Sequence, residues 1–149
     1  MNDLLFRTFI PIQPKGKGRP KILRRKTKKG IVPIAITPDA TVNAEQAIRW
    51  HVSQTWHQAP LDQPLDVTIV AFFIKPISKP KKVIVPAVKP DFDNLAKLVC
   101  DSLNGLLWTD DSRIVDGSCQ KRYCTPGYPQ EGFLLTVRAM PDSLEGEEF

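Results

Sequence analysis

The chain has 149 residues, enough for one domain with a buried core, and its 42% hydrophobic and 25% charged residues are ordinary for a globular protein. The net charge is +5, and because the segment 142–149 holds four acids and no base, residues 1–141 carry +9. A body this basic favours a polyanionic partner. No run of about 18 apolar residues exists, and the first residues do not resemble a secretory signal, so we expect neither a membrane span nor secretion.

The N-terminal part of the chain predicts a strand followed by a basic loop. Apolar residues alternate over residues 4–14, which favours a strand. Residues 15–29 then hold nine basic side chains, with glycine and proline interrupting any regular element, so we expect a mobile basic loop. This loop is either a solvated charge run or an arm that grips phosphates. The candidate phosphate contacts are Lys15, Lys17, Arg19, Lys21, Arg24 and Arg25.

A short strand and a helix are expected next. Residues 31–37 fit a strand, and Thr41 is the predicted N-cap of a helix that runs to about His57. We assign Trp50 and Trp56 to the core or to a dimer contact rather than to base stacking. The predicted buried face of the helix, with one residue every four positions, consists of Ala44, Ile48, Val52 and Trp56.

The strongest strand signal covers residues 64–75. Its apolar residues are nearly unbroken, so we expect this strand at the centre of a sheet. Residues 78–89 are rich in proline and lysine and predict a loop with a second basic patch. The lysines of this patch are Lys79, Lys81, Lys82 and Lys89.

The C-terminal half predicts a second helix and two strands. The helix covers residues 93–104 and stops at Gly105. The strands cover 113–123 and 133–138 and are joined by a hairpin-like loop. The buried stripe of the helix is Leu95, Leu98, Val99 and Leu103. Together the elements predict an α+β fold for a single domain over residues 1–141, with a mixed sheet of four or five strands and two main helices. We expect the acidic tail, 142–149, to be disordered.

Acidic residues at the start of the second helix carry the predicted chemistry. Asp91 and Asp93 flank the helix start, and Asp93, Lys97 and Asp101 share one polar face. A helix cap needs one carboxylate, and the Asp93–Lys97 pair is worth only about 0.2–0.5 kcal/mol, so capping leaves the second acid unexplained. A further pair, Asp110-Asp111, follows one helix and one turn later.

A cluster of these acids would bind a divalent cation. If the chain doubles back so that the two pairs meet, their carboxylates repel each other unless they are protonated or bind a metal. Oxygen ligands favour Mg²⁺, Mn²⁺ or Ca²⁺ over zinc. In a basic chain such a site indicates phosphodiester hydrolysis, with Lys97 as the candidate to stabilise the developing charge. The spacing alone does not establish that the two pairs meet.

Three ordered motifs resemble the RusA family of bacterial and prophage Holliday junction resolvases. They are KPDFDNLAK at 89–97, DSLNG at 101–105 and WTDDSRI at 108–114. A weaker similarity covers 14–20 and 37–38. Members of this family often carry glutamine where Arg113 stands, which leaves the acid cluster intact but puts the contacts near it in doubt.

The resemblance implies an α+β homodimer that needs Mg²⁺, for which Mn²⁺ can substitute, and we expect no small-molecule cofactor. It implies that Asp91, Asp93 and Asp111 are the catalytic metal ligands, with Asp110 the less favoured neighbour of Asp111. It also implies that Lys97 is the catalytic lysine.

The expected function is therefore a cytoplasmic endonuclease that resolves four-way junctions by paired, symmetric nicks in DNA recombination and repair. A two-fold dimer matches the symmetry of the junction, and the basic loops would hold its arms through phosphates. We assign Phe92 to the core rather than to DNA contact. Two alternatives stay open: a metal nuclease for other branched or flap DNA, and a non-catalytic basic nucleic-acid-binding protein whose aspartates cap a helix.

Overall fold

The strand with the strongest sequence signal forms the centre of the sheet. In the computed structural model, which describes residues 3–17, 21–36 and 39–149, strand β4 (Leu65–Phe73) pairs in parallel with β5 (Ile114–Tyr123) and antiparallel with β6 (Gly132–Ala139). Its alternate side chains, from Leu65 to Ala71, are buried. The prediction of a central strand is confirmed.

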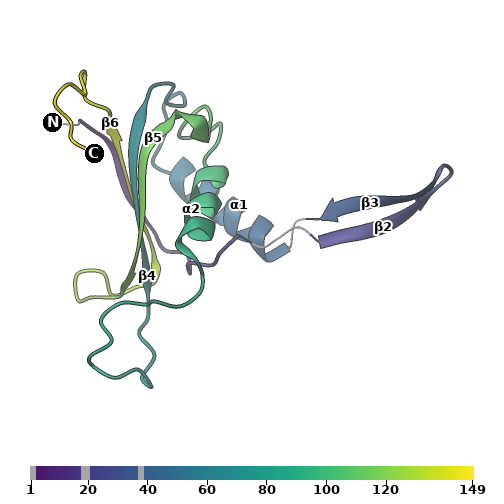
Figure 1. Cartoon of the computed structure of the whole chain (residues 1–149), viewed down its shortest axis with the longest axis horizontal. Coiled ribbons are helices and arrows are strands. Elements are labelled where there is room, and N and C mark those ends of the chain that lie inside the picture. Colours follow the sequence, from purple (N-terminus) through teal and green to yellow (C-terminus); the bar gives the residue numbers. More distant parts are fainter. Residues whose placement is uncertain (1–2, 18–20, 37–38) are drawn as a thin grey trace.

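Over the described residues, the main sheet has four strands in the order β1-β6-β4-β5, and both helices lie against one of its faces (Figure 1). Two further strands form a separate hairpin. The remaining elements are β1 (Leu4–Ile10), β2 (Lys21–Thr27), β3 (Gly30–Ile36), α1 (Asp39–Ser53), α2 (Phe92–Ser102) and the 3-10 turn η1 (Asp111–Arg113). The α+β prediction with two main helices is confirmed.

The core lies between the helices and the sheet. The predicted stripe of α2 is confirmed, because each of its four residues is at most 1% exposed. From α1, Ile48 and Val52 enter the same core and Ala44 is partly buried against it, and Trp56, which lies just beyond the helix end at Ser53, is buried there too. Trp50 is 65% exposed, so it lies outside the core of this chain, and its assignment to a dimer contact stays a prediction.

The predicted loop 15–29 contains a strand. Residues Lys21–Thr27 form β2, which pairs antiparallel with β3, so the expectation of no regular element is wrong for these residues. The interrupting glycines and proline lie before residue 21, and Gly30, at a φ of 119°, closes the turn between the strands. The strand predicted over 31–37 is confirmed as β3, whereas Arg19 and the Thr37–Pro38 motif lie outside the described residues.

Two connections also differ from expectation. Helix α1 begins at Asp39, so Thr41 lies inside the first turn and is not the N-cap. The loop 125–132 is not a hairpin loop, because β4 lies between β5 and β6 in the sheet. The loop instead crosses the end of β4, which leaves β5 as a parallel edge strand. The tail 142–149 forms no helix or strand in the described chain, and its disorder stays a prediction.

A tight approach of two backbones at the start of β6 generates a stability prediction. A Cβ atom at Gly132 would overlap the carbonyl oxygen of Ile10 and the ring of Phe9, and the backbone oxygen cannot move without breaking the pairing of β1 with β6. Gly132→Ala should therefore lower the free energy of unfolding by about 1–3 kcal/mol, measured by urea denaturation. Gly127→Ala is the matched control, since its Cβ would meet only Thr125 Oγ1 at 3.8 Å. Equal stability of the two variants would contradict this reading.

Candidate active site

The predicted acids lie at the two ends of helix α2. Asp91 occupies the N-cap position and Asp93 lies in the first turn, both exposed. Asp101 lies near the other end of the helix, where the side chain of Asp111 approaches it from η1 closely enough for Asp101 to raise the pKa of Asp111. The chain therefore doubles back, as the acid-cluster hypothesis required, but it returns to the C-terminal end of α2.

Hydrogen bonds around Trp108 fix this return. The buried indole donates to Asn104 Oδ1 at 3.1 Å and to the carbonyl of Cys100 at 3.3 Å. Arg49 of α1 donates to the carbonyls of Ser102 and Asn104, which satisfies acceptors left open at the helix end. Gly105, with a φ of 74°, makes the turn. These motif residues thus serve to place Asp111.

Asp111 lies in an environment that disfavours its charge. Partial burial raises its pKa, as do the negative charge of Asp110 and the hydrogen bond with Asp101, whereas Lys97 lowers it. Asp110 differs, because Ser112 lowers the pKa of its carboxyl, first through the hydrogen bond with the Ser112 side chain and then through the backbone N–H of Ser112, which donates to the carboxylate at 3.1 Å. The preference for Asp111 over Asp110 as a ligand therefore stays a prediction with a physical basis: the carboxylate of Asp110 already caps η1.

Asp101 has a larger part in this arrangement than the sequence suggested. It accepts a 2.5 Å hydrogen bond from Lys17 Nζ, which also lies 3.4 Å from Glu45 Oε1. The hydrogen bond with Asp101 is the main reason why the pKa of Lys17 is raised. A predicted phosphate contact is therefore engaged in ion pairs within the chain. The sequence signal was the position of Asp101 on the same helical face as Asp93 and Lys97.

The other end of α2 opens into a basic cleft. In the described part of the chain, the Asp91 side chain accepts no capping hydrogen bond from the backbone N–H groups of the first turn. The N-terminal segment runs close beside the helix, where a Cβ at Gly16 would lie only 3.2 Å from that of Asn94. The cleft between them is lined by Asp91 together with Pro14, Lys15, Gly16, Lys17, Lys89, Pro90 and Asn94. Three predicted phosphate contacts thus lie around one predicted metal ligand.

Lys121 of β5 borders Asp91 and Asp93 on the opposite side. It lines a second open cleft with these two acids, and its ammonium donates to the carbonyls of Val88 and Pro90 at 2.6 and 3.1 Å. These bonds hold the segment that leads into α2 against the sheet. Sequence reasoning did not single out Lys121, because no spacing connects it to the motif.

One chain does not assemble the predicted set of acids. Asp93 and Asp101 are eight residues apart on α2, about 12 Å along the helix axis at its usual rise. Among the described residues, no three His, Cys, Asp or Glu side chains come close enough to form a metal-binding group. Lys97 is exposed on the helix between the two ends. Asp91 and Asp93 are thus brought together with each other, but not with Asp110 and Asp111.

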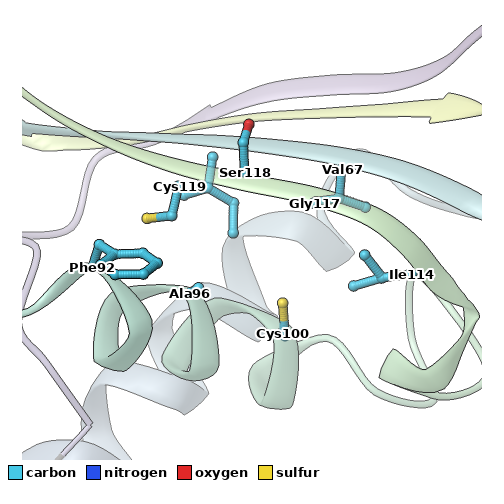
Figure 2. Close-up of a pocket in the computed structure, with 9 residues that line it drawn as sticks. Val67, Phe92, Ala96, Cys100, Ile114, Gly117, Ser118 and Cys119 are labelled. Carbon is cyan, nitrogen blue, oxygen red and sulfur yellow. The ribbon is translucent and has the colours of Figure 1, made fainter. Parts of the chain in front are cut away.

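An apolar groove runs between α2 and the edge strand β5. Figure 2 shows Phe92, Ala96 and Cys100 along the helix, facing Gly117 and Cys119 of the strand. Phe92 is 62% exposed, so its assignment to the core is wrong. The reason is its place in the first turn at the open end of the groove, whereas the stripe that enters the core begins at Leu95. Burial raises the pKa of the Cys100 thiol to about 12 and that of Cys119 to about 11.

The remaining predicted contacts lie on two projections. Lys21, Arg24 and Arg25 are exposed on β2, far from the sheet (Figure 1). The second basic patch lies in the connection from β4 to α2, where Lys79, Lys81 and Lys82 are exposed. Arg113 is paired with Asp62 through its Nε at 2.9 Å, which orients it along the surface.

The fold and site define a basic α+β protein with an acidic helix start between lysines. The family model described as endodeoxyribonuclease RusA matches residues 11–127, and the chain therefore belongs to this family. It is also similar to a Bacillus subtilis (strain 168) protein named YqaN and described as uncharacterized, with 37% identity over 67 residues, 40% of this chain and 47% of that protein. The match thus spans about half of the relative. Among the described residues, no helix has the length and apolar composition needed to cross a membrane.

The environment of Asp111 predicts a pH-dependent gain in stability on its neutralisation. A carboxyl group whose pKa is raised on folding binds its proton more tightly in the folded state, so its ionisation destabilises the fold at neutral pH. Asp111→Asn should therefore raise the melting temperature at pH 7, and the gain should vanish below pH 3.8, the ordinary aspartate value, where the wild-type carboxyl is protonated in both states. Circular dichroism melts of both proteins test this, with Asp142→Asn in the tail as the control. A lower melting temperature at pH 7 would contradict it.

Proposed function

We propose that this protein is a Mg²⁺-dependent endonuclease that resolves four-way DNA junctions by paired, symmetric nicks, with Mn²⁺ able to replace Mg²⁺. The observation that carries the proposal is the uncapped Asp91 at the start of α2, in a cleft with Lys15 and Lys89, in a chain of the RusA family. Carboxylates supply hard oxygen ligands for the ion, and the lysines supply phosphate contacts next to them. We place this activity in the cytoplasm, because the three cysteines are free thiols.

The geometry argues against the non-catalytic alternative. If the aspartates served only to cap the helix, the side chain of Asp91 would accept a backbone N–H of the first turn, and in the described chain it does not. The carboxyl of Asp111 lies against two other acids, which costs stability at neutral pH. Carboxylates that neither cap a helix nor stabilise the fold indicate a functional role.

A second subunit supplies what one chain lacks. The outer edge of β5 carries exposed residues along most of its length, beside the apolar groove and the exposed ring of Phe92. If two β5 strands pair antiparallel about Cys119, Asp116 lies opposite Arg122 of the partner subunit, an attractive cross-strand pair. A two-fold axis there would also bring opposite ends of the two α2 helices toward each other. We therefore propose a homodimer whose ion takes Asp91 and Asp93 from one subunit and Asp111 from the other.

In this dimer, each residue of the proposed site has a chemical role. A bound divalent ion would polarise the scissile phosphate and activate water. Asp91 and Asp93 hold charge at the helix start, Lys97 lies beside them on the exposed face, and Lys121 positions the segment before the helix through two carbonyls. The candidate DNA contacts, apart from Lys17, are free of ion pairs among those described, and two such active sites would face opposing strands.

Asp93→Asn should keep junction binding and reduce nicking by about 100-fold or more, since the amide removes a charged ligand without changing the fold. The assay is a synthetic four-way junction with labelled strands, with flap and linear duplex of equal length alongside. Asp142→Asn, which removes one exposed carboxylate from the tail, is the matched control and should cut normally. EDTA should abolish nicking, and Mg²⁺ or Mn²⁺ should restore it.

The same assay separates the alternatives. Binding by the wild type without nicks in either metal would favour the non-catalytic protein. Faster cutting of flaps than of junctions would favour a nuclease for other branched DNA.

Mixing subunits tests the shared site. Asp93→Asn and Asp111→Asn should each be inactive, but refolding them together should restore about a quarter of the intact sites, because half of the dimers are mixed and each mixed dimer regains one site. The readout is single nicks in the junction. A mixture of Asp91→Asn with Asp93→Asn is the matched control and should stay inactive, because both changes fall in the same half-site. If the first mixture is also inactive while both variants dimerise, the shared site is wrong.

A further inference from the structure

The β2–β3 hairpin accounts for the net positive charge of the chain. Residues 21–36 contain six basic and no acidic side chains, whereas the rest of the sequence contains 15 basic and 16 acidic ones. The net charge of +5 therefore comes from this hairpin alone. Long-range attraction of a polyanion must act chiefly through it.

The hairpin projects from the domain and buries almost nothing. Figure 1 shows both strands extending away from the helices and the sheet. Every residue of β2 is exposed, and so is every residue of β3 except Ile34, which is half-buried. Large apolar side chains share this exposure, with Ile22 at 73% and Ile31 at 66%. An isolated two-stranded hairpin is marginally stable in water, so these side chains indicate a surface that a partner covers.

The register divides the hairpin lengthwise into a basic strand and an apolar strand. Arg24 lies opposite Pro33, Arg25 opposite Val32, and Lys26 opposite Ile31. Because side chains alternate along a strand, Arg25 points to one face of the ribbon, whereas Arg24 and Lys26 point to the other. Cations thus leave the ribbon on both faces, and β3 presents uncharged side chains between them.

These features fit DNA better than another protein chain. Pro33 lacks an N–H group in the middle of β3, which blunts this edge against the addition of a further strand. Outside its own hairpin, a second copy of this chain carries 15 basic and 16 acidic side chains, so its body offers no strong opposite charge to the hairpin. Duplex DNA offers phosphates on both walls of a groove and apolar thymine methyl groups on the floor of the major groove.

We infer that the β2–β3 hairpin is a two-stranded ribbon that enters the major groove of a duplex arm, an inference that rests on the proposed action on branched DNA. The major groove, about 12 Å wide, admits such a ribbon, whereas the minor groove, about 6 Å wide, does not. Seven residues per strand span about 23 Å, enough to cross the groove. Cations on both faces then reach both phosphate walls, and β3 meets the base edges.

Dimethyl sulfate footprinting tests this, because the reagent methylates guanine N7 in the major groove and adenine N3 in the minor groove. The wild type is bound to a four-way junction in EDTA, so that cleavage is not required. It should protect a short run of guanine N7 atoms in the duplex arms. The variant Arg24→Ala/Arg25→Ala/Lys26→Ala should lose this protection even at saturating protein and bind at least about tenfold more weakly.

The charge-matched control is Lys79→Ala/Lys81→Ala/Lys82→Ala, in the loop after β4. Both triple variants should flatten the dependence of affinity on salt by about 0.9 per lost phosphate contact, but only the hairpin variant should lose N7 protection. Protection at adenine N3 alone would overturn the inference. So would unchanged N7 reactivity together with a change in the oligomeric state of the hairpin variant, since the hairpin would then dock on protein. Failure to nick in Mg²⁺ would instead count against the proposed nuclease and leave the footprint unaffected.

Discussion

The position of the site depends on helix α2, which has one buried apolar face and one exposed polar face. The leucine stripe is fully buried against the sheet and α1, so the opposite face, with Asp93 and Lys97, must face solvent. Burial of the apolar stripe supplies most of the free energy that holds the helix in place, because each fully buried leucine contributes about 1.5–3 kcal/mol. The acids themselves add little to stability. They are held in position by apolar contacts on the other side of the same helix.

The acidic residues at the two ends of α2 differ in their partners. At the C-terminal end, Asp101 shares its carboxylate between Lys17 and Asp111, so a cation and an acid compete for one group. At the N-terminal end, Asp91 lines an open cleft together with Lys15 and Lys89. The first end is a closed arrangement of partners within the chain. The second leaves ligands available, which is what a metal and a phosphate need.

Charge is also divided between the body of the protein and its projection. The hairpin carries the net positive charge, and the rest of the chain, with its acidic tail, carries 15 basic and 16 acidic side chains. This separation lets the hairpin attract DNA over a distance. The acids at the start of α2 lie away from that concentrated positive charge, which leaves them able to bind a cation. Exposed apolar side chains beside the cations allow the hairpin to make apolar contacts as well, which electrostatic attraction to phosphates does not require.

The sequence by itself determined the central strand, the buried stripe of α2, the acids at its start and the basic character of the chain, because each follows from periodicity or composition along one element. Only the tertiary structure decided that Asp111 returns to Asp101, that Lys17 pairs with that acid, and that β5 is a parallel edge strand beside an exposed Phe92. Spacing fixes the face on which a residue lies. It does not fix the end of a helix to which a turn returns, since that depends on distant partners such as Arg49 and the packing around Trp108.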